Sequence, residues 1–253
     1  MTRSWINYWE LTQELAKREI KQRYKQSVLG YAWVILNPFF QMVVMSFVFS
    51  KIVPSTTIGV PYPVFLFTAL LPWTFFANSL IASVNSLVGN AGLLTKVYFP
   101  REIFVISALM AKVIDFALAI TVFIGLMIWY QVPVGWTVLW VIPILLIQIL
   151  FTYGISLIAA CANLFYRDIQ YLMNLIILLW FYMTPVLYPV EMFPPQYRWV
   201  FQINPMAVIV NAYREVILSQ GSPNLVSLAI ALALSVLLTL IGYTMFKKLE
   251  GTF

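Results

Sequence analysis

Long runs of apolar residues alternate with short polar segments along most of this chain. A helix needs roughly 18–20 residues to cross some 30 Å of hydrocarbon, and six runs are about that long or longer. They cover residues 30–53, 62–88, 103–130, 136–163, 169–188 and 225–246. The pattern predicts an all-α, polytopic membrane protein in which residues 1–253 form one domain and residues 28–188 hold the first five spans.

The polar segment before the first run, residues 1–27, has two unlike faces. One face is less polar, and its residues recur at spacings of three or four: Trp5, Trp9, Thr12, Ala16, Ile20 and Tyr24. The other face carries the charged residues Glu10, Glu14, Lys17, Lys21 and Lys25. Tryptophan opposite lysine is typical of a helix at a membrane surface, so we expect an amphipathic interface helix. A solvated helix without a role is the alternative.

The first and fifth runs each contain a stripe in which an asparagine accompanies aromatic residues. The stripe of the first run consists of Trp33, Asn37, Phe40, Val44 and Phe47. The stripe of the fifth run consists of Tyr171, Asn174, Leu178, Phe181, Pro185 and Tyr188. Such stripes can face a cavity or a partner helix instead of lipid, and plain packing is the alternative. Pro38 removes a backbone donor within the first run, which predicts a kink there.

Two opposite charges lie inside the third run. Lys112 and Asp115 are three residues apart, so their side chains can meet on one face of a helix. Unpaired charge at membrane depth is costly, and an intramembrane charge is by default a functional hypothesis. The helical spacing of opposite signs favours a neutral structural pair, and the sequence leaves its role open.

The pattern changes between the fifth and sixth runs. Residues 189–222 contain four prolines and several short apolar pieces, none of which is long enough to span a membrane. Pieces of this length are typical of re-entrant or interfacial segments, which survive at membrane depth only beside protein or a water-filled cavity. We therefore expect a gate segment here, with an ordinary loop on the outer surface as the alternative.

Composition and charge support the membrane prediction and add an orientation. The chain is 62% hydrophobic and 9% charged, whereas charged residues make up about a quarter of soluble domains. If both termini are cytoplasmic, eleven Lys and Arg residues lie inside and three outside, with Lys112 in the membrane. The positive-inside rule therefore predicts cytoplasmic termini. The basic balance follows from this topology, and no nucleic-acid motif accompanies it.

The side chains needed for common enzyme chemistry are missing from the sequence. There is no histidine, and Cys161 is the single cysteine. Histidine-based metal sites, catalytic triads and proton relays are therefore excluded. No phosphate-binding loop and no pair of carboxylates near a plausible pocket occurs. We predict no catalytic residue, no metal site and no cofactor of the chain's own, so any work must draw its energy from an ion gradient or from another subunit.

Four stretches together resemble a known family. Residues 23–38, 71–79, 96–102 and 204–206 look like the permease subunit of type-2 polysaccharide-export ABC transporters, which move O-antigen, capsular polysaccharide or teichoic acid. The resemblance implies ATP-driven export of an undecaprenyl-linked polysaccharide, O-antigen first among them, across the cell inner membrane. It also implies a homodimer in contact with membrane lipid and with two cytoplasmic subunits that bind ATP and Mg.

The resemblance also assigns roles to individual residues. The channel would be lined by Trp33, Asn37, Phe40, Phe47, Tyr171, Asn174, Phe181 and Tyr188. The ATPase-coupling residues, at the interface helix and the short segment of residues 89–102, would be Lys21, Lys25, Asn90, Leu94, Lys96, Tyr98, Arg101 and Glu102. The outer gate would contain Pro189, Pro194, Pro195 and Pro205.

Two other functions remain open at this stage. One is a type-2 ABC permease that exports a drug or a free lipid. The other is a membrane scaffold that recruits cytoplasmic proteins without transporting anything. The sequence also leaves open which glycan is carried, how its length or end group is sensed, and whether the ATPase partner has a carbohydrate-binding domain.

Overall fold

The computed structural model describes residues 2–23, 25–53, 59–94 and 100–252, and the side chains of these residues except 2–7, 93–94 and 252. The α-helices are α1 (Thr2–Arg23), α2 (Ala32–Phe49), α4 (Tyr62–Gly89), α5 (Ala91–Leu94), α6 (Glu102–Trp129), α7 (Val141–Phe165), α8 (Ile169–Met183), α9 (Trp199–Ile203), α10 (Pro205–Ile217) and α11 (Leu225–Leu249). The short 3-10 helices are η1 (Trp136–Trp140), η2 (Val190–Met192), η3 (Pro195–Tyr197) and η4 (Glu250–Thr252). The described residues contain no strand, which confirms the all-α class.

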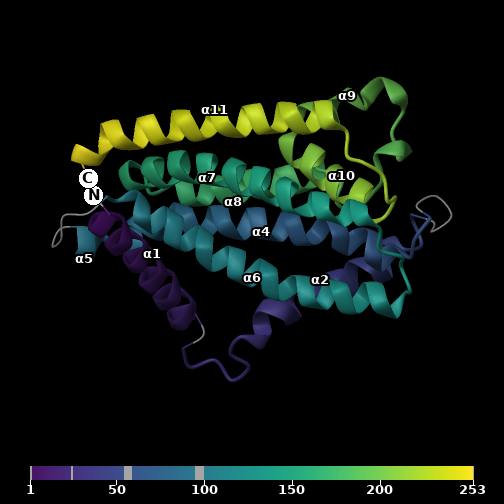
Figure 1. The fold of residues 1–253 in the computed structure, drawn as a ribbon, viewed down its shortest axis with the longest axis horizontal. Helices are drawn as coiled ribbons and strands as arrows, with labels where there is room; N and C mark the ends of the chain where they lie inside the picture. The colour runs from purple at the N-terminus through teal and green to yellow at the C-terminus, as the bar shows by residue number, and fades with distance from the viewer. Residues whose placement is uncertain (1, 24, 54–58, 95–99, 253) are drawn as a thin grey trace.

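The long helices run roughly side by side and form a bundle (Figure 1). Both chain termini lie at one end of the bundle, which we call the terminal end. Helices α9 and α10 lie toward the opposite end, which we call the far end. Within the described ranges, five helices are long and apolar enough to cross a membrane: α2, α4, α6, the joined η1–α7 and α11.

The fifth predicted span is shorter than the sequence suggested. Helix α8 ends at Met183 instead of continuing to residue 188, and Thr184 is extended, with φ −101° and ψ 134°. Pro185 disfavours helical geometry in the residue before it, which ends the helix. The 15 residues of α8 reach only about 22 Å, less than the roughly 30 Å of a hydrocarbon core. The full set of six predicted spans is therefore not confirmed by the described helices, and the fifth run ends earlier than predicted.

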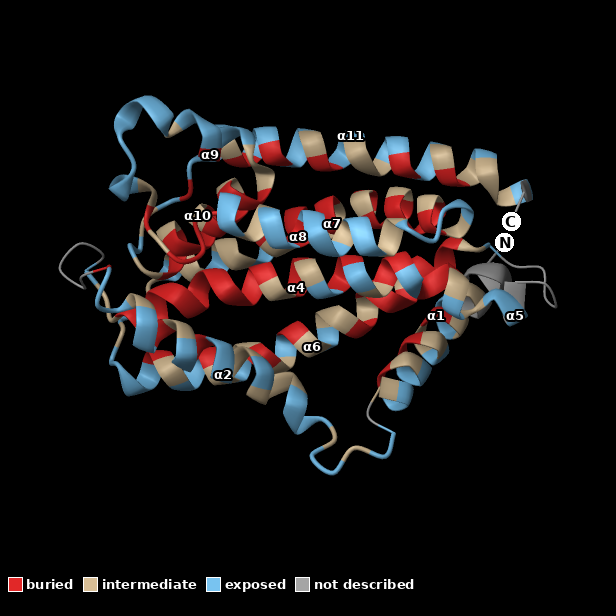
Figure 2. Ribbon diagram, turned by 180° about the vertical axis from the view of Figure 1, so that it is seen from behind, coloured by how far each residue is buried: buried red, intermediate tan, exposed pale blue. Residues whose placement is uncertain are grey.

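Helix α4 forms the centre of the bundle. Its most apolar 18-residue window is 83% buried, whereas that of α2 is 11% buried. Helices α2, α6, α7, α8 and α10 all pack against α4, and Figure 2 shows it as the most continuously buried helix. A helix that is apolar on every side is typical of such a central position. One core cluster extends along the bundle, and a second one lies where α4, α6, α7 and α11 meet at the terminal end.

Helices α7 and α11 approach each other at two glycines. A Cβ atom on Gly154 would lie 2.7 Å from the backbone nitrogen of Thr239, and one on Gly242 would lie 2.6 Å from the carbonyl oxygen of Gly154. The Thr239 hydroxyl donates a hydrogen bond of 3.0 Å to the carbonyl of Leu150. Small residues allow such close backbone approach between membrane helices, so this contact depends on glycine.

The two-faced character predicted for the N-terminal segment is present in α1. Thr12, Ala16 and Ile20 are buried, and α1 packs against α6. This part of the less polar face therefore covers protein, whereas Trp9 on the same face is 53% exposed. Lys17 and Lys21 on the charged face are exposed. The side chain of Trp5 and the whole of Tyr24 lie outside the described residues.

Residues 189–222, which we call the far-end segment, contain short helices, as the proline pattern predicted. Pro189 and Pro194 directly precede η2 and η3, Pro195 begins η3, and Pro205 begins α10. Proline suits these positions because its fixed φ starts a helix and its missing donor is not needed there. Helix α10 is largely buried and packs against α4, α7 and α11. Whether the segment works as a gate stays a prediction.

Candidate functional site

A cavity of about 740 Å³ lies between α2, α4, α6 and α8, and Arg23 at the end of α1 also lines it. We call it the central cavity. Its aromatic lining residues are Trp33, Trp73, Phe75, Phe116, Phe181 and Tyr182. Its neutral polar lining residues are Asn37, Gln41, Thr74, Asn78 and Asn174. The rings of Trp73 and Phe181 lie 5.5 Å apart and join α4 to α8.

Four of the eight residues predicted to line a channel do line this cavity. They are Trp33 and Asn37 on α2, and Asn174 and Phe181 on α8. The other four do not line it: Phe40, Phe47, Tyr171 and Tyr188. Phe40, Phe47 and Tyr171 are exposed, Phe47 by 76%. A channel role for these three stays a prediction, because a second copy of the chain could cover them.

Tyr188 directly precedes the far-end segment. Its ring centroid lies 5.1 Å from that of Phe193 and 6.2 Å from that of Phe201. Its hydroxyl donates a hydrogen bond of 2.7 Å to the carbonyl of Tyr182. The stripe predicted along the fifth run therefore ends before Tyr188, because α8 ends at Met183 and the chain then changes direction.

Several lining residues were missed by the stripe prediction. Gln41 lies one helical turn after Asn37 on α2 and lines the same cavity. The predicted stripe instead moved to Phe40 and Val44, which follow a slightly different line along the helix. Asn78 on α4 also lines the cavity. An amide inside a long apolar run was the available sequence signal in both cases.

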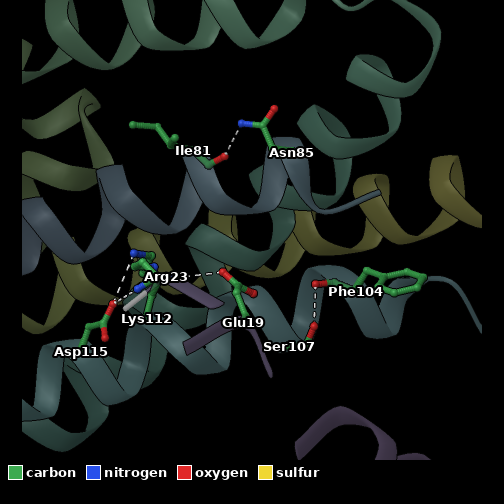
Figure 3. Close-up of polar contacts among 8 residues, drawn as sticks. All are labelled: Glu19, Arg23, Ile81, Asn85, Phe104, Ser107, Lys112 and Asp115. Atoms are coloured by element: carbon green, nitrogen blue, oxygen red, sulfur yellow. Dashed lines mark hydrogen bonds and ion pairs between the residues drawn. The ribbon is translucent and has the colours of Figure 1, made fainter. Parts of the chain in front are cut away.

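Three charged lining residues of the central cavity, Arg23, Lys112 and Asp115, form an ion cluster with Glu19 (Figure 3). The predicted pair is present, because Lys112 Nζ lies 3.3 Å from Asp115 Oδ2. Arg23 Nη1 lies 2.5 Å from the same oxygen, and Arg23 Nη2 lies 3.1 Å from Glu19. The prediction of a neutral pair is therefore incomplete, because Asp115 binds two cations. No feature of the sequence placed Arg23 beside α6.

The ion cluster also separates two spaces. An adjoining cavity of about 410 Å³ is lined by residues of α1 and α4 that include Arg18, Glu19 and Asn85. Arg23, Asn78 and Lys112 line both cavities. Burial raises the pKa of Glu19 above its usual value, against the lowering effect of Arg23.

A buried arginine holds the chain where α8 ends. Arg214 of α10 donates hydrogen bonds to the carbonyls of Pro185, at 2.5 Å, and Val186, at 2.8 Å. Its guanidinium carbon lies 3.7 Å from the centre of the Phe65 ring. Arg214 is one of the three basic residues that the positive-inside count placed outside, with Lys51 and Arg198, and its side chain is buried. Carbonyls and an aromatic face stabilise its charge, and they fix the extended segment after α8.

Three of the predicted coupling residues make defined contacts within the chain. Asn90 donates a hydrogen bond of 2.8 Å from its amide to the carbonyl of Ser86 at the end of α4. The backbone N–H of Arg101 donates to Glu250 Oε1 at 2.9 Å, and its guanidinium donates to the Glu250 carbonyl. Glu102 is 7% exposed and lies 2.8 Å from Lys247.

The remaining predicted coupling residues are less constrained or lie outside the described part. Lys21 and Lys25 are exposed. Leu94 ends α5, but its side chain is outside the described residues, as are Lys96 and Tyr98 entirely. The coupling role of all eight residues stays a prediction.

The charged groups at the terminal end influence one another. Burial and the negative charge of Glu102 raise the pKa of Tyr8 to about 12, although Lys247 opposes this. Burial alone would raise the pKa of Glu250, but the N–H of Arg101 and the ammonium of Lys247 hold it below its usual value. Residues of α1, α6 and α11 therefore meet at this end of the bundle.

The chemistry that the central cavity offers is binding. Aromatic rings present apolar faces, while amides and hydroxyls both donate and accept hydrogen bonds. Within the described ranges, no group of three or more Cys, Asp or Glu side chains could hold a metal ion. Cys161 is buried in the core at the terminal end. The arrangement suits a large neutral ligand that carries many hydroxyl groups.

The chain is similar to several known membrane proteins. Residues 10–218 match the family described as ABC-2 type transporter. An O-antigen export system permease protein, RfbA, of Klebsiella pneumoniae is 35% identical over 247 residues, which cover 97% of this chain and 94% of that protein. RfbA of Myxococcus xanthus is 29% identical, covering 100% and 97%. The polysialic acid transport protein KpsM of Escherichia coli is 25% identical, covering 99% and 98%.

Proposed function

The chain belongs to the ABC-2 type transporter family, and from this premise we propose that it is the membrane permease of an ATP-driven polysaccharide exporter. O-antigen is the proposed cargo, because the relatives at 35% and 29% identity are named as O-antigen export permeases. The match extends over 94% or more of each of these relatives. The observation that carries the proposal is the central cavity with its aromatic and amide lining.

The lining explains how a polymer could move without being trapped. Sugar rings place their apolar faces on aromatic side chains such as Trp33, Trp73 and Phe181, while their hydroxyls exchange hydrogen bonds with Asn37 and Asn174. Each contact is weak and can be replaced by an equivalent one as the next sugar arrives. The charged groups of the lining are confined to the ion cluster beside α1.

The complete channel is proposed to form between two copies of the chain. Helices α2 and α8 border the central cavity, yet only 11% of α2 is buried and α8 buries one residue, Ile177. A second copy facing α2 and α8 would enclose the cavity from the open side. Phe40, Phe47 and Tyr171 would then lie at or near the contact between copies.

The energy is proposed to come from two cytoplasmic ATP-binding subunits. These subunits would bind ATP and Mg, because this chain contains no phosphate-binding loop. The distribution of Lys and Arg supports placing the terminal end in the cytoplasm. The long apolar helices and the transporter family support a location in the cell inner membrane. Helix α1 and residues 89–102 would then face the ATP-binding subunits.

The proposal is tested by assembly and by loss of export. Purification with the co-expressed ATP-binding subunit of the same organism is expected to give a stable complex that hydrolyses ATP. Failure to form one would favour the scaffold alternative. Deletion of the chain is expected to leave lipid-linked glycan on the cytoplasmic face of the membrane. Unchanged glycan export after deletion would favour export of a drug or free lipid.

A further inference from the structure

Four charged residues join the start of α6 to the end of α11, which lie far apart in sequence. Arg101 and Glu102 lie at the start of α6, while Lys247 and Glu250 lie at the end of α11 and the beginning of η4. We call this group the C-terminal clasp. It joins the start of α6, at the end of the predicted coupling segment of residues 89–102, to the end of α11 and η4.

Glu250 is the shared acceptor within the clasp. One carboxylate oxygen accepts the backbone N–H of Arg101 at 2.9 Å, and the other accepts Lys247 Nζ at 2.9 Å. The carbonyl of Glu250 accepts the Arg101 guanidinium. Lys247 also donates to the carboxylate of Glu102 at 2.8 Å. Each of these bonds involves a charged group, which makes them stronger than hydrogen bonds between neutral groups.

Glu250 also supplies a hydrogen-bond acceptor and a negative charge to the start of α6. The residue before this helix, Arg101, makes no side-chain capping bond to the helix. The first N–H groups of a helix need acceptors from elsewhere, and negative charge is favourable there. The carboxylate of Glu250 supplies this acceptor and this charge. Lys247, in the last turn of α11, is in turn favourable for the C-terminal end of its own helix.

The clasp adjoins the second core cluster. Directly beside it lies the second core cluster, in which Leu87, Phe104, Leu157 and Phe246 come from four different helices. The other end of residues 89–102 is held by Asn90, whose amide binds the end of α4. The segment therefore has two anchors, and the second depends on the C-terminal turn.

We propose that Glu250 is a positioning residue for the ATPase-coupling segment, acting through Arg101 and, via Lys247, through Glu102. This inference rests on the proposed function, which supplies the coupling role of residues 89–102. Force applied to the segment reaches α4 through Asn90 and reaches α6 and α11 together through the clasp. The C-terminal turn is thus part of the coupling apparatus.

Two measurements on Glu250→Ala and Glu250→Gln test the inference. Hydrogen exchange of the chain alone, in lipid nanodiscs, is expected to be about tenfold faster at residues 101–104 in Glu250→Ala, because two charge-assisted bonds are lost. Glu250→Gln keeps an acceptor for the Arg101 N–H and is expected to fall between Glu250→Ala and the unaltered chain. In the complex, Glu250→Ala is expected to hydrolyse several times more ATP for each glycan exported.

Lys248 offers a matched control, because it is the neighbouring lysine and is exposed. Lys247→Met is expected to reproduce the uncoupling, whereas Lys248→Met is expected to behave as the unaltered chain.

A variant that was merely unstable would lose hydrolysis and export in proportion. Equal exchange rates in Glu250→Ala and Lys248→Met, or an unchanged ratio of hydrolysis to export, would overturn the inference. Failure of the unaltered chain to bind an ATP-binding subunit would instead refute the proposed function, while the exchange measurement would still decide whether the clasp anchors the segment.

Discussion

Asp115 shows how single residues fasten the elements of this protein together. Two cations, Arg23 from α1 and Lys112 from its own helix, share one oxygen of its carboxylate. The other oxygen is buried and has no hydrogen-bond partner among the described residues. Removing one partner from a buried ion pair is strongly destabilising, because the remaining charge is left uncompensated. The cluster therefore holds the end of α1 against α6.

Asp115→Asn is expected to lower the free energy of unfolding by about 1–3 kcal/mol, because Arg23 and Lys112 lose their shared carboxylate. Thermal unfolding in detergent measures the change. Glu14→Gln is the matched control, because its ion pair with Lys17 is exposed and such pairs contribute about 0–1 kcal/mol. Equal shifts in both variants would contradict a structural role for the cluster.

Arg214 stabilises the extended segment after α8 through its buried contacts. Arg214→Lys is expected to destabilise the protein by about 1–3 kcal/mol, because an ammonium cannot bind the Pro185 and Val186 carbonyls and cover Phe65 with the same geometry. Arg198→Lys is the control, since Arg198 also donates to backbone carbonyls but at an exposed site. Thermal unfolding compares the two. A loss as large for Arg198→Lys would show that burial of Arg214 is irrelevant.

At the scale of elements, the pairing of α7 with α11 depends on backbone contact. Gly154→Ala is expected to lower stability by about 1–3 kcal/mol, because the new methyl group overlaps the backbone of α11 at Thr239. Gly125→Ala on α6 is the control, since a Cβ atom there meets nothing within 4 Å. Unfolding in detergent measures both. A neutral Gly154→Ala would show that the helices can separate without cost.

The helices of this protein were predictable from the sequence, whereas most contacts between them were not. The long helices α4, α6, α7 and α11 were predictable because length and apolarity alone define a span. Helix α8 was predicted too long because Pro185 was placed inside the span, whereas it ends the helix. Trp33, Asn37, Asn174 and Phe181 were predictable as a cavity lining from their periodicity. Arg23, Arg214 and the C-terminal clasp were not, because their partners lie on other helices and depend on tertiary packing.

At the scale of the whole molecule, the central cavity of one chain is open on the side formed by α2 and α8. Its walls α2 and α8 are apolar, long stretches of both are exposed, and the proposed dimer would join them. Cysteines that replace Phe40 or Tyr171, in a Cys161→Ser background, are expected to crosslink two copies. A cysteine at Val226 on the exposed side of α11 is expected not to. Crosslinking from Val226 alone would place the contact on a different face.

We propose that glycan passes through the central cavity, and a covalent crosslink between the cavity lining and the glycan would demonstrate it. A photo-reactive side chain replaces Phe181 in the complex during active export, and the same group replaces Val226 on the exposed side of α11 as the control. The group at position 181 is expected to crosslink to glycan only while ATP is hydrolysed, and the group at position 226 is expected not to crosslink to it. Export of glycan with no crosslink at position 181, or with equal crosslinking at position 226, would show that the glycan takes another path.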